Sequence, residues 1–259
     1  MEYWTSYITD VGTYRKTNQD ALLIKMAKTS SGTALLAAIA DGVGGLKCGE
    51  LASNTMVHDL AEWFEKELPV FIKFDNWMES AKTSLLAVVR NTHTKLYDYM
   101  QKRNIQLGTT VALLFLFENR YLIIHVGDTR VYRYDMCDMC QLTKDHTYVQ
   151  REIDAGRMTI EEAKNCGREH ILTQCIGFSP QMIPDIQTGT VNTSSIFLIC
   201  SDGFRNSVTN MELKETLKRA GNCKQDIFDQ ILQNTVNLIK ERGEKDNISA
   251  LFIKCIQER

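Results

Sequence analysis

The sequence predicts an α+β fold, a β-sandwich of two antiparallel sheets flanked by pairs of helices in four layers, α-β-β-α. Apolar strand segments follow one another through tight turns, as antiparallel strands do. The helical segments come in pairs rather than singly between strands, which argues against alternating βαβ units. No Ser/Gly-rich or charged linker interrupts the 259 residues, so we expect one domain over residues 1–259.

The first part of the chain predicts three strands and then two helices. Strand segments at residues 4–9, 21–27 and 34–40 are each bounded by turn residues. Helices are expected over residues 49–66 and 76–103, where apolar residues recur at helical spacing.

The second part predicts a β block, a mixed polar segment and a final group of strands and helices. The β block consists of residues 109–117, 121–126 and 131–134, separated by turn residues. Residues 145–176 are polar and helix-like. The remaining strands are expected at 183–191, 196–200 and 248–256, with helices at 211–220 and 225–242.

Composition and charge exclude several classes of protein. The formal net charge of −2 gives no general attraction to nucleic acid or to an anionic membrane. No apolar stretch approaches the roughly 20 residues of a membrane span. The first ten residues, MEYWTSYITD, lack a secretory signal pattern. We therefore expect a cytoplasmic monomer without nucleic-acid or membrane partners.

The eight cysteines are scattered, and only Cys137 and Cys140 form a C-x-x-C pair. This pair lies in YDMCDMCQL, which is typical of a hairpin tip between two strands. A structural zinc site needs a second such pair or a histidine pair, and none follows at suitable spacing. We favour ordinary reduced thiols over a metal or redox role for this pair.

Aspartate residues stand where apolar strands end or begin. Each one alone is typical of a turn, because Asp and Gly are turn formers. As a set they predict carboxylates held on rigid strand ends, which favours hard cations such as Mg²⁺ or Mn²⁺ over zinc. The positions are Asp20, Asp41, Asp128, Asp202 and Asp246.

The glycine-rich stretch after Asp41 also raises the alternative of a phosphate-binding loop. A Walker loop starting at Gly44 would need lysine where Glu50 stands. A dinucleotide fingerprint starting at Gly42 would need glycine where Lys47 stands. A glutamate facing a nucleotide phosphate would repel it, so the metal interpretation is favoured.

Eight short motifs in this order resemble the metal-dependent protein phosphatase 2C family (PPM-type Ser/Thr phosphatases), most of all its compact bacterial members. The resemblance extends from about residue 8 to residue 254, nearly the whole chain. The motifs are RKTNQDA (15–21), IADGVGG (39–45), GELAS (49–53), GTT (108–110), HVGDTRVYR (125–133), LTKDHT (142–147), LICSDGF (198–204) and DNIS (246–249).

This resemblance implies Mn²⁺- or Mg²⁺-dependent hydrolysis of phosphoserine and phosphothreonine in proteins by a metal-bridged water, opposing a cognate Ser/Thr kinase. Two ions can activate a shared water for in-line attack on phosphorus. By motif match, Asp41 bridges the two ions and the Gly42 carbonyl completes the second site. Asp202 and Asp246 hold the first ion, and Asp20 takes a metal-bound water.

The same motif match assigns Asp128 to a third, weaker metal site that it shares with Asp202. Arg15 matches the arginine that grips the substrate phosphate, a role for which its planar fork is suited. Without the motif, Arg15 would be interpreted as a surface arginine near a strand.

Two residues depart from the pattern of many relatives. Val43 stands where eukaryotic members have a histidine proposed as general acid, and valine cannot donate a proton. Bacterial members generally carry an apolar residue there too, so Val43 does not imply an inactive protein. The leaving group would take its proton from water or need little protonation. Gln19 stands where relatives often have glutamate, and its neutral amide is expected to weaken binding of the second ion.

His146 lies at the entry to a segment that the resemblance marks as the flap, residues 147–177. It is interpreted either as a hydrogen-bonding anchor near the active face or as a residue beside a capping Asp145 or Thr147. The flap is the expected place for selection of protein substrates. No functional signal is found for the other histidines, which are His58, His93, His125 and His170. His125 is expected in a core strand.

Two alternatives to the phosphatase remain open at this point. A regulatory pseudophosphatase would bind phosphoproteins without turnover, although the complete set of aspartates argues against it. A metal-dependent phosphodiesterase would act on a small nucleotide, although no base-stacking signature supports it.

Overall fold

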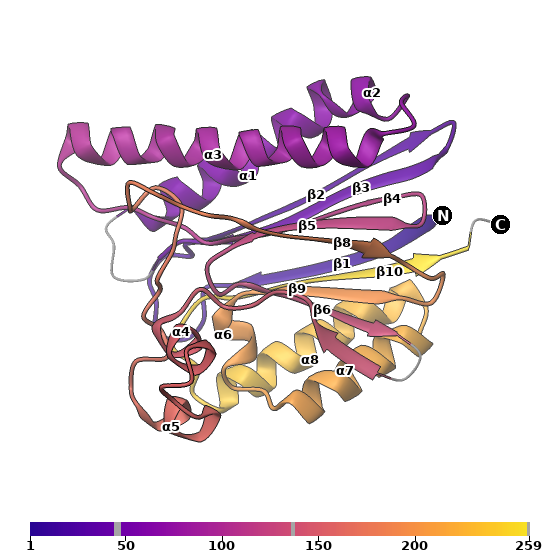
Figure 1. The fold of residues 1–259 in the computed structure, drawn as a ribbon. Helices are drawn as coiled ribbons and strands as arrows, with labels where there is room; N and C mark the ends of the chain where they lie inside the picture. Colours follow the sequence, from indigo (N-terminus) through magenta and orange to yellow (C-terminus); the bar gives the residue numbers. More distant parts are fainter. Residues whose placement is uncertain (44–47, 136–137, 258–259) are drawn as a thin grey trace.

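The computed structural model describes residues 1–43, 48–135 and 138–257. Two five-stranded antiparallel sheets face each other, and helices cover both outer faces (Figure 1). The predicted α+β sandwich is therefore confirmed. No helix among these residues is long and apolar enough to span a membrane.

The two sheets take their strands from both halves of the chain. The first sheet has the order β1 (Glu2–Asp10), β10 (Ile248–Ile256), β9 (Ile196–Cys200), β6 (Arg130–Asp135) and β7 (Asp138–Gln141). The second has the order β2 (Asp20–Thr29), β3 (Gly32–Asp41), β4 (Val111–Phe117), β5 (Arg120–Val126) and β8 (Asp185–Thr190).

Helices form the two outer layers and one end of the molecule (Figure 1). The second sheet is covered by α1 (Gly49–Lys66), α2 (Leu68–Phe71) and α3 (Trp77–Arg103). The first sheet is covered by α7 (Asn210–Asn222), the 3₁₀ turn η1 (Gln225–Ile227) and α8 (Phe228–Glu241). The short helices α4 (Tyr148–Asp154), α5 (Ile160–Asn165) and α6 (Asp202–Arg205) lie at the end of the sandwich away from the chain termini.

The predicted elements differ from the observed ones mainly at their ends. The helix expected over 225–242 begins with the η1 turn and becomes α-helical at Phe228. The strand expected from 109 begins at Val111, since Thr109 forms only isolated bridges to Gly42 and Ile176. The helices α2 and α6 are too short for a periodic pattern and were not predicted.

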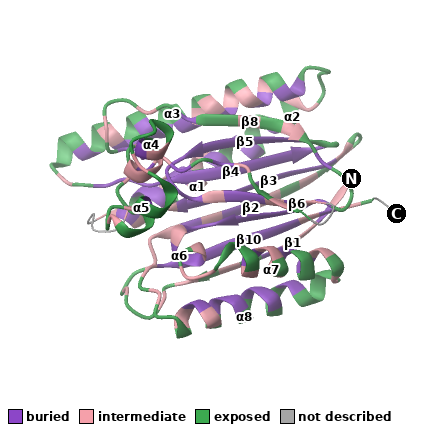
Figure 2. Ribbon diagram, turned by 60° about the horizontal axis from the view of Figure 1, so that its bottom comes forward, coloured by how far each residue is buried: buried purple, intermediate pink, exposed green. Residues whose placement is uncertain are grey.

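The sequence of strand β3 is apolar at successive positions, without the alternation of a strand that has one exposed face. Leu36 and Ala38 pack into the cluster beneath α1 and α3, whereas Leu35, Ala37 and Ile39 pack into the cluster between the sheets. Because both faces are covered, each of these residues is fully buried, and β3 lies in the middle of the buried layer in Figure 2. A strand buried on both faces reads as a continuous apolar run.

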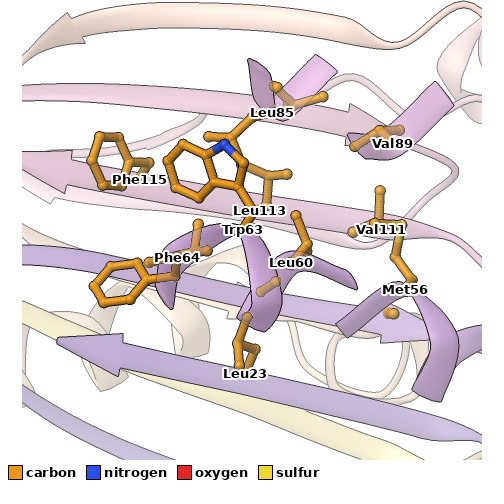
Figure 3. Packing of buried hydrophobic residues seen from close by; sticks show 14 of the residues in the cluster. Leu23, Met56, Leu60, Trp63, Phe64, Leu85, Val89, Val111, Leu113 and Phe115 are labelled. Atoms are coloured by element: carbon orange, nitrogen blue, oxygen red, sulfur yellow. The ribbon is translucent and has the colours of Figure 1, made fainter. Parts of the chain in front are cut away.

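Aromatic residues fill the layer between the second sheet and its helices. Trp63 of α1 meets Phe115 of β4 edge to face, with ring centroids 5.7 Å apart (Figure 3). Leu60 and Leu85 approach the same cluster from α1 and α3. Burial of these large side chains supplies most of the driving force for docking the helices. The strand ends are thereby held on a rigid layer.

Candidate metal centre

Antiparallel pairing brings the five predicted aspartates to one end of the sandwich. In such a sheet, the start of one strand lies beside the end of its neighbour. Asp20 opens β2 and Asp41 closes β3, and the two are direct partners in register. Asp128 follows the end of β5, Asp202 follows β9, and Asp246 precedes β10. Both sheets thus deliver carboxylates to the same place.

A pocket of about 460 Å³ lies at this end of the sandwich. Four of the five aspartates line it, together with Arg15, Val43 and His170. They surround a space rather than converge on one point, because no three described aspartates have oxygens all within 4.8 Å of one another. Such a spread suits more than one bound ion. The aspartates at the pocket are Asp41, Asp128, Asp202 and Asp246.

Three of these carboxylates, those of Asp41, Asp128 and Asp202, resist ionisation because of burial. Burial raises the pKa of Asp41 well above its ordinary value, and the charges of Asp20 and Asp202 raise it further. Burial and the charge of Asp202 raise the pKa of Asp128 to about 7, against the opposing charge of Arg205. A divalent cation would compensate these like charges, so the donor set fits hard metal ions.

Asp20 is not among the residues that line the pocket, although it pairs directly with Asp41. Both of its carboxylate oxygens are buried, and the side chains of Ser249 and Ser201 are the hydrogen-bonding groups near them. Burial raises the pKa of Asp20 to about 7, and the charges of Asp202 and Asp246 contribute to the rise.

We predict that protein freed of divalent ions becomes less stable as the pH rises from 3.8, the ordinary aspartate value, to about 7. In this window the folded chain holds protons on Asp20 and Asp128 that the unfolded chain has lost, so stability falls with pH. Urea unfolding of wild type and of Asp20→Asn across this range isolates the contribution of Asp20. A pH-independent difference between the two proteins would contradict the prediction, and Mn²⁺ should reduce the loss at pH 7.

The backbone around Gly42 has no room for a side chain. Its N–H donates to the carbonyl of Gln19 at 3.1 Å. A Cβ at position 42 would lie 2.6 Å from the carbonyl carbon of Gly49 and 2.8 Å from the carbonyl oxygen of Gln19. The adjacent Asp41 is fixed through its backbone, since Thr110 N–H donates to its carbonyl at 2.8 Å. Gly42 is therefore required by close packing at the metal-centre end of β3.

Replacing Gly42 by alanine should lower the free energy of unfolding by about 1–3 kcal/mol, because the clashing atoms belong to the backbone and must shift. The shift would also move the Gly42 carbonyl and weaken Mn²⁺ binding. Gly221→Ala is the matched control, because a Cβ there meets only the Tyr134 ring at 3.9 Å. Urea unfolding and Mn²⁺ titration of both variants test this, and equal behaviour of the two would contradict it.

Arg15 lines the pocket and is held there by Asp246. Its Nε donates to Asp246 Oδ1 at 3.0 Å, and its Nη2 donates to Oδ2 at 2.8 Å. This fork uses two of the five N–H donors of the guanidinium. The hydrogen bonds to Asp246 raise the pKa of Arg15, so its charge is constant at all physiological pH values. Asp246 thus orients Arg15 towards the pocket while leaving other donors of the fork for a ligand.

Gln19 lies behind Gly42, next to the start of α1. Its side-chain amide donates to Glu50 Oε2 at 3.2 Å, and its carbonyl accepts from Ser53 Oγ at 2.6 Å. Glu50 therefore supplies a carboxylate close to the neutral amide, which the sequence did not indicate. Val43 lines the pocket and donates its N–H to the carbonyl of Gly108 at 3.0 Å.

His146 joins the flap entry to the turn that carries Asp128. Its Nδ1 accepts from the Gly127 N–H at 3.2 Å, and its Nε2 lies 3.2 Å from Asp185 Oδ2. Because Nδ1 accepts, the neutral ring carries its proton on Nε2, the nitrogen nearest to Asp185. Thr147 caps α4 by accepting from the Gln150 N–H.

Two groups of three described residues have ligand atoms within 4.8 Å of one another: His125, His146 and Asp185, and His58, Asp59 and Glu62. The proton on His146 Nε2 occupies the position that a metal would need in the first group. His125 is buried in β5, as expected, and burial lowers its pKa to about 4. The second group lies on α1, with His58 and Glu62 exposed to solvent.

Two residues at the site were not singled out by the sequence. His170 Nδ1 lies 3.8 Å from Asp202 Oδ2, and its side chain is 71% exposed. Arg205, on α6, contacts Asp128 and Asp145. Both positions depend on how segments distant in sequence meet, and neither residue stands in a strand-end pattern.

Other predicted features lie elsewhere or outside the described residues. Gly44, Gly45 and Cys137 lie outside them, so the turn after Gly42 and the complete C-x-x-C pair are not part of this description. Cys140 is an exposed free thiol in β7.

Comparison with known proteins finds similarity to one family of protein phosphatases. A family model described as protein phosphatase 2C matches residues 14–249. Protein phosphatase PhpP of Streptococcus pneumoniae is 27% identical over 256 residues, covering 98% of each chain.

Solved structures of serine/threonine phosphatases are also similar to this chain. The serine/threonine phosphatase of S. agalactiae superimposes with a TM-score of 0.84 at 27% identity, covering 98% of this chain and all of that one. Serine/threonine phosphatase Stp1 from Staphylococcus aureus gives a TM-score of 0.83 at 27% identity and covers all of this chain and 96% of its own.

Proposed function

Because this chain belongs to the protein phosphatase 2C family, we propose that it hydrolyses phosphoserine and phosphothreonine in proteins with two Mn²⁺ or Mg²⁺ ions. Asp41 would bridge the ions, the Gly42 carbonyl would serve the second, and Asp202 and Asp246 would hold the first. Asp20, which pairs with Asp41 in register, would bind a water of the metal shell.

The observation that carries this proposal is the convergence of carboxylates from both sheets on one pocket. Asp41 belongs to the second sheet, whereas Asp202 and Asp246 adjoin strands of the first. Burial raises the pKa of Asp41 and of Asp202, which gives the site a strong demand for positive charge. Bound ions would supply that charge and an activated water.

The chain's own residues would bind and orient the substrate. Arg15, held by Asp246, presents a planar fork that suits two phosphate oxygens. Val43 lines the pocket and has no proton to give, so the leaving group would take its proton from solvent.

We further propose that residues 147–177 select among phosphoproteins and that a Ser/Thr kinase supplies them. This segment carries α4 and α5, and its residues His170 and Leu172 reach the wall of the metal pocket. Surface segments beside a rigid site commonly carry specificity. Residues 1–259 would act as one domain.

One assay separates the candidate functions. Phosphate release is measured with and without Mn²⁺ on a phosphothreonine peptide, on p-nitrophenyl phosphate and on a cyclic nucleotide. The phosphatase predicts Mn²⁺-dependent release from the peptide and the small ester, and no hydrolysis of the cyclic nucleotide. Binding of the peptide without turnover would indicate a pseudophosphatase, and cleavage of the cyclic nucleotide alone would indicate a phosphodiesterase.

A further inference from the structure

A second pocket, of about 640 Å³, adjoins the metal pocket and is lined by residues of α4 and α5. We call it the flap pocket, because most of its lining belongs to residues 147–177. His170 and Asn206 line both pockets. Figure 1 shows α4 and α5 at the same end of the sandwich as α6. A polypeptide bound at the metal pocket can therefore continue directly into the flap pocket.

The flap pocket has apolar residues from both short helices. Val149 and Ile153 stand four positions apart on α4, and Ile160 and Ala163 stand three apart on α5, so each pair shares one helix face. None of the four belongs to a core cluster of the described residues. Ile160 is 66% exposed, so part of this apolar lining is open to solvent.

Capping hydrogen bonds fix the two helices that carry this lining. At the start of α4, Thr147 accepts from the Gln150 N–H. At the start of α5, Thr159 accepts from the Glu162 N–H, and the Glu162 carboxylate accepts from the Thr159 N–H at 2.8 Å. This reciprocal cap holds the first turn of α5, in which Ile160 is the first residue. The position of Ile160 is thus set before a ligand binds.

The charged groups that line the flap pocket lie close to charges of opposite sign. Arg130 binds both oxygens of Asp145, at 2.8 Å and 2.7 Å, and Arg205 lies 3.3 Å from the same carboxylate. Lys164 and Glu169 add one charge of each sign to the lining. An ionic ligand would compete with these contacts. Apolar contact is therefore the interaction that the pocket offers most readily.

We propose that the flap pocket binds an apolar side chain of the phosphoprotein substrate, a few residues along the chain from the phosphorylated serine or threonine. The inference rests on the proposed function, because it places the phosphate in the metal pocket. Val149, Ile153 and Ile160 would contact that side chain. They determine specificity and touch no reacting atom.

The first experiment measures kcat/KM of the whole chain with Mn²⁺ on a set of phosphothreonine peptides. In each peptide one leucine replaces serine at a different position before or after the phosphothreonine. One position should favour leucine by about tenfold, as contact of an apolar side chain with such a pocket gives. Ile160→Ser should remove most of this preference. Equal kcat/KM for leucine and serine at every position would overturn the proposal.

Ile160→Lys gives a result that a general loss of structure cannot imitate. It should reverse the preference at that position from leucine to glutamate, because a cation would stand where the apolar side chain was bound. Ile183→Ser is the matched control, since Ile183 is 71% exposed and lines neither pocket. It should keep the wild-type preference. A leucine preference that persists in both Ile160 variants would overturn the proposal.

Hydrolysis of p-nitrophenyl phosphate separates failure of this proposal from failure of the proposed function, because the ester has no chain that could reach the flap pocket. If only this proposal is wrong, wild type hydrolyses the ester and all peptides, with equal rates for the leucine and serine peptides. If the proposed function is wrong, neither the ester nor any peptide releases phosphate in the presence of Mn²⁺, and both proposals fail.

Discussion

Asp41→Asn should lower kcat/KM for a phosphothreonine peptide by more than about a thousandfold. Asp41 ends a strand whose interior residues are all buried, and it pairs with Asp20, so its carboxylate has a fixed position at the pocket. Asparagine keeps the size but removes the charge that two ions would share. Loss of several kcal/mol of charge stabilisation in the transition state corresponds to this factor. Initial rates at saturating Mn²⁺ measure it.

Asp138→Asn is the matched control, because this aspartate is 86% exposed on β7 and lies outside the pocket. Its activity should equal that of wild type. Wild-type activity in Asp41→Asn would refute the role of Asp41. Circular dichroism shows whether the variant is folded, so lost activity is not confused with unfolding.

Arg15→Lys should lower kcat/KM by about a hundredfold to a thousandfold, as removal of an oriented donor to a phosphoryl oxygen does. Lysine keeps the positive charge but cannot bind Asp246 and phosphate oxygens with one planar group. The loss should appear for both the peptide and p-nitrophenyl phosphate, since both present the same phosphoryl group.

Arg219→Lys, an exposed position on α7, is the control for a conservative arginine change. Two outcomes would contradict the assignment of Arg15 to the phosphate: unchanged kinetics, or a loss confined to the peptide. The second would place Arg15 in contact with the protein part of the substrate. A Mn²⁺ titration of Arg15→Lys separates a lost phosphate contact from weakened metal binding through Asp246.

The layered fold could be predicted because local patterns coincide with burial. The helix expected over residues 49–66 is α1 with the same ends, and its apolar side packs on the sheet. The run from Ala34 to Ala40 is apolar because helices cover one face and the other sheet covers the opposite face. The short helix α6 left no such pattern, because four residues make barely one turn.

The gathering of the aspartates was predictable because strand ends in antiparallel sheets meet at the same edge. The residues that contact these aspartates could not be predicted. Arg205 reaches Asp128 across 77 positions of sequence, and Arg15 reaches Asp246 across 231. His170 approaches Asp202 from an irregular segment. Such contacts depend on loop paths and side-chain directions, which periodicity does not encode.

The most direct test of the two-ion centre is anomalous diffraction from a crystal of this protein grown with Mn²⁺. We predict two anomalous peaks in the pocket, roughly 3.5–4 Å apart, with the carboxylate of Asp41 between them and Asp202 and Asp246 beside one. Absence of both peaks from this pocket, or a single peak away from Asp41, would contradict the account.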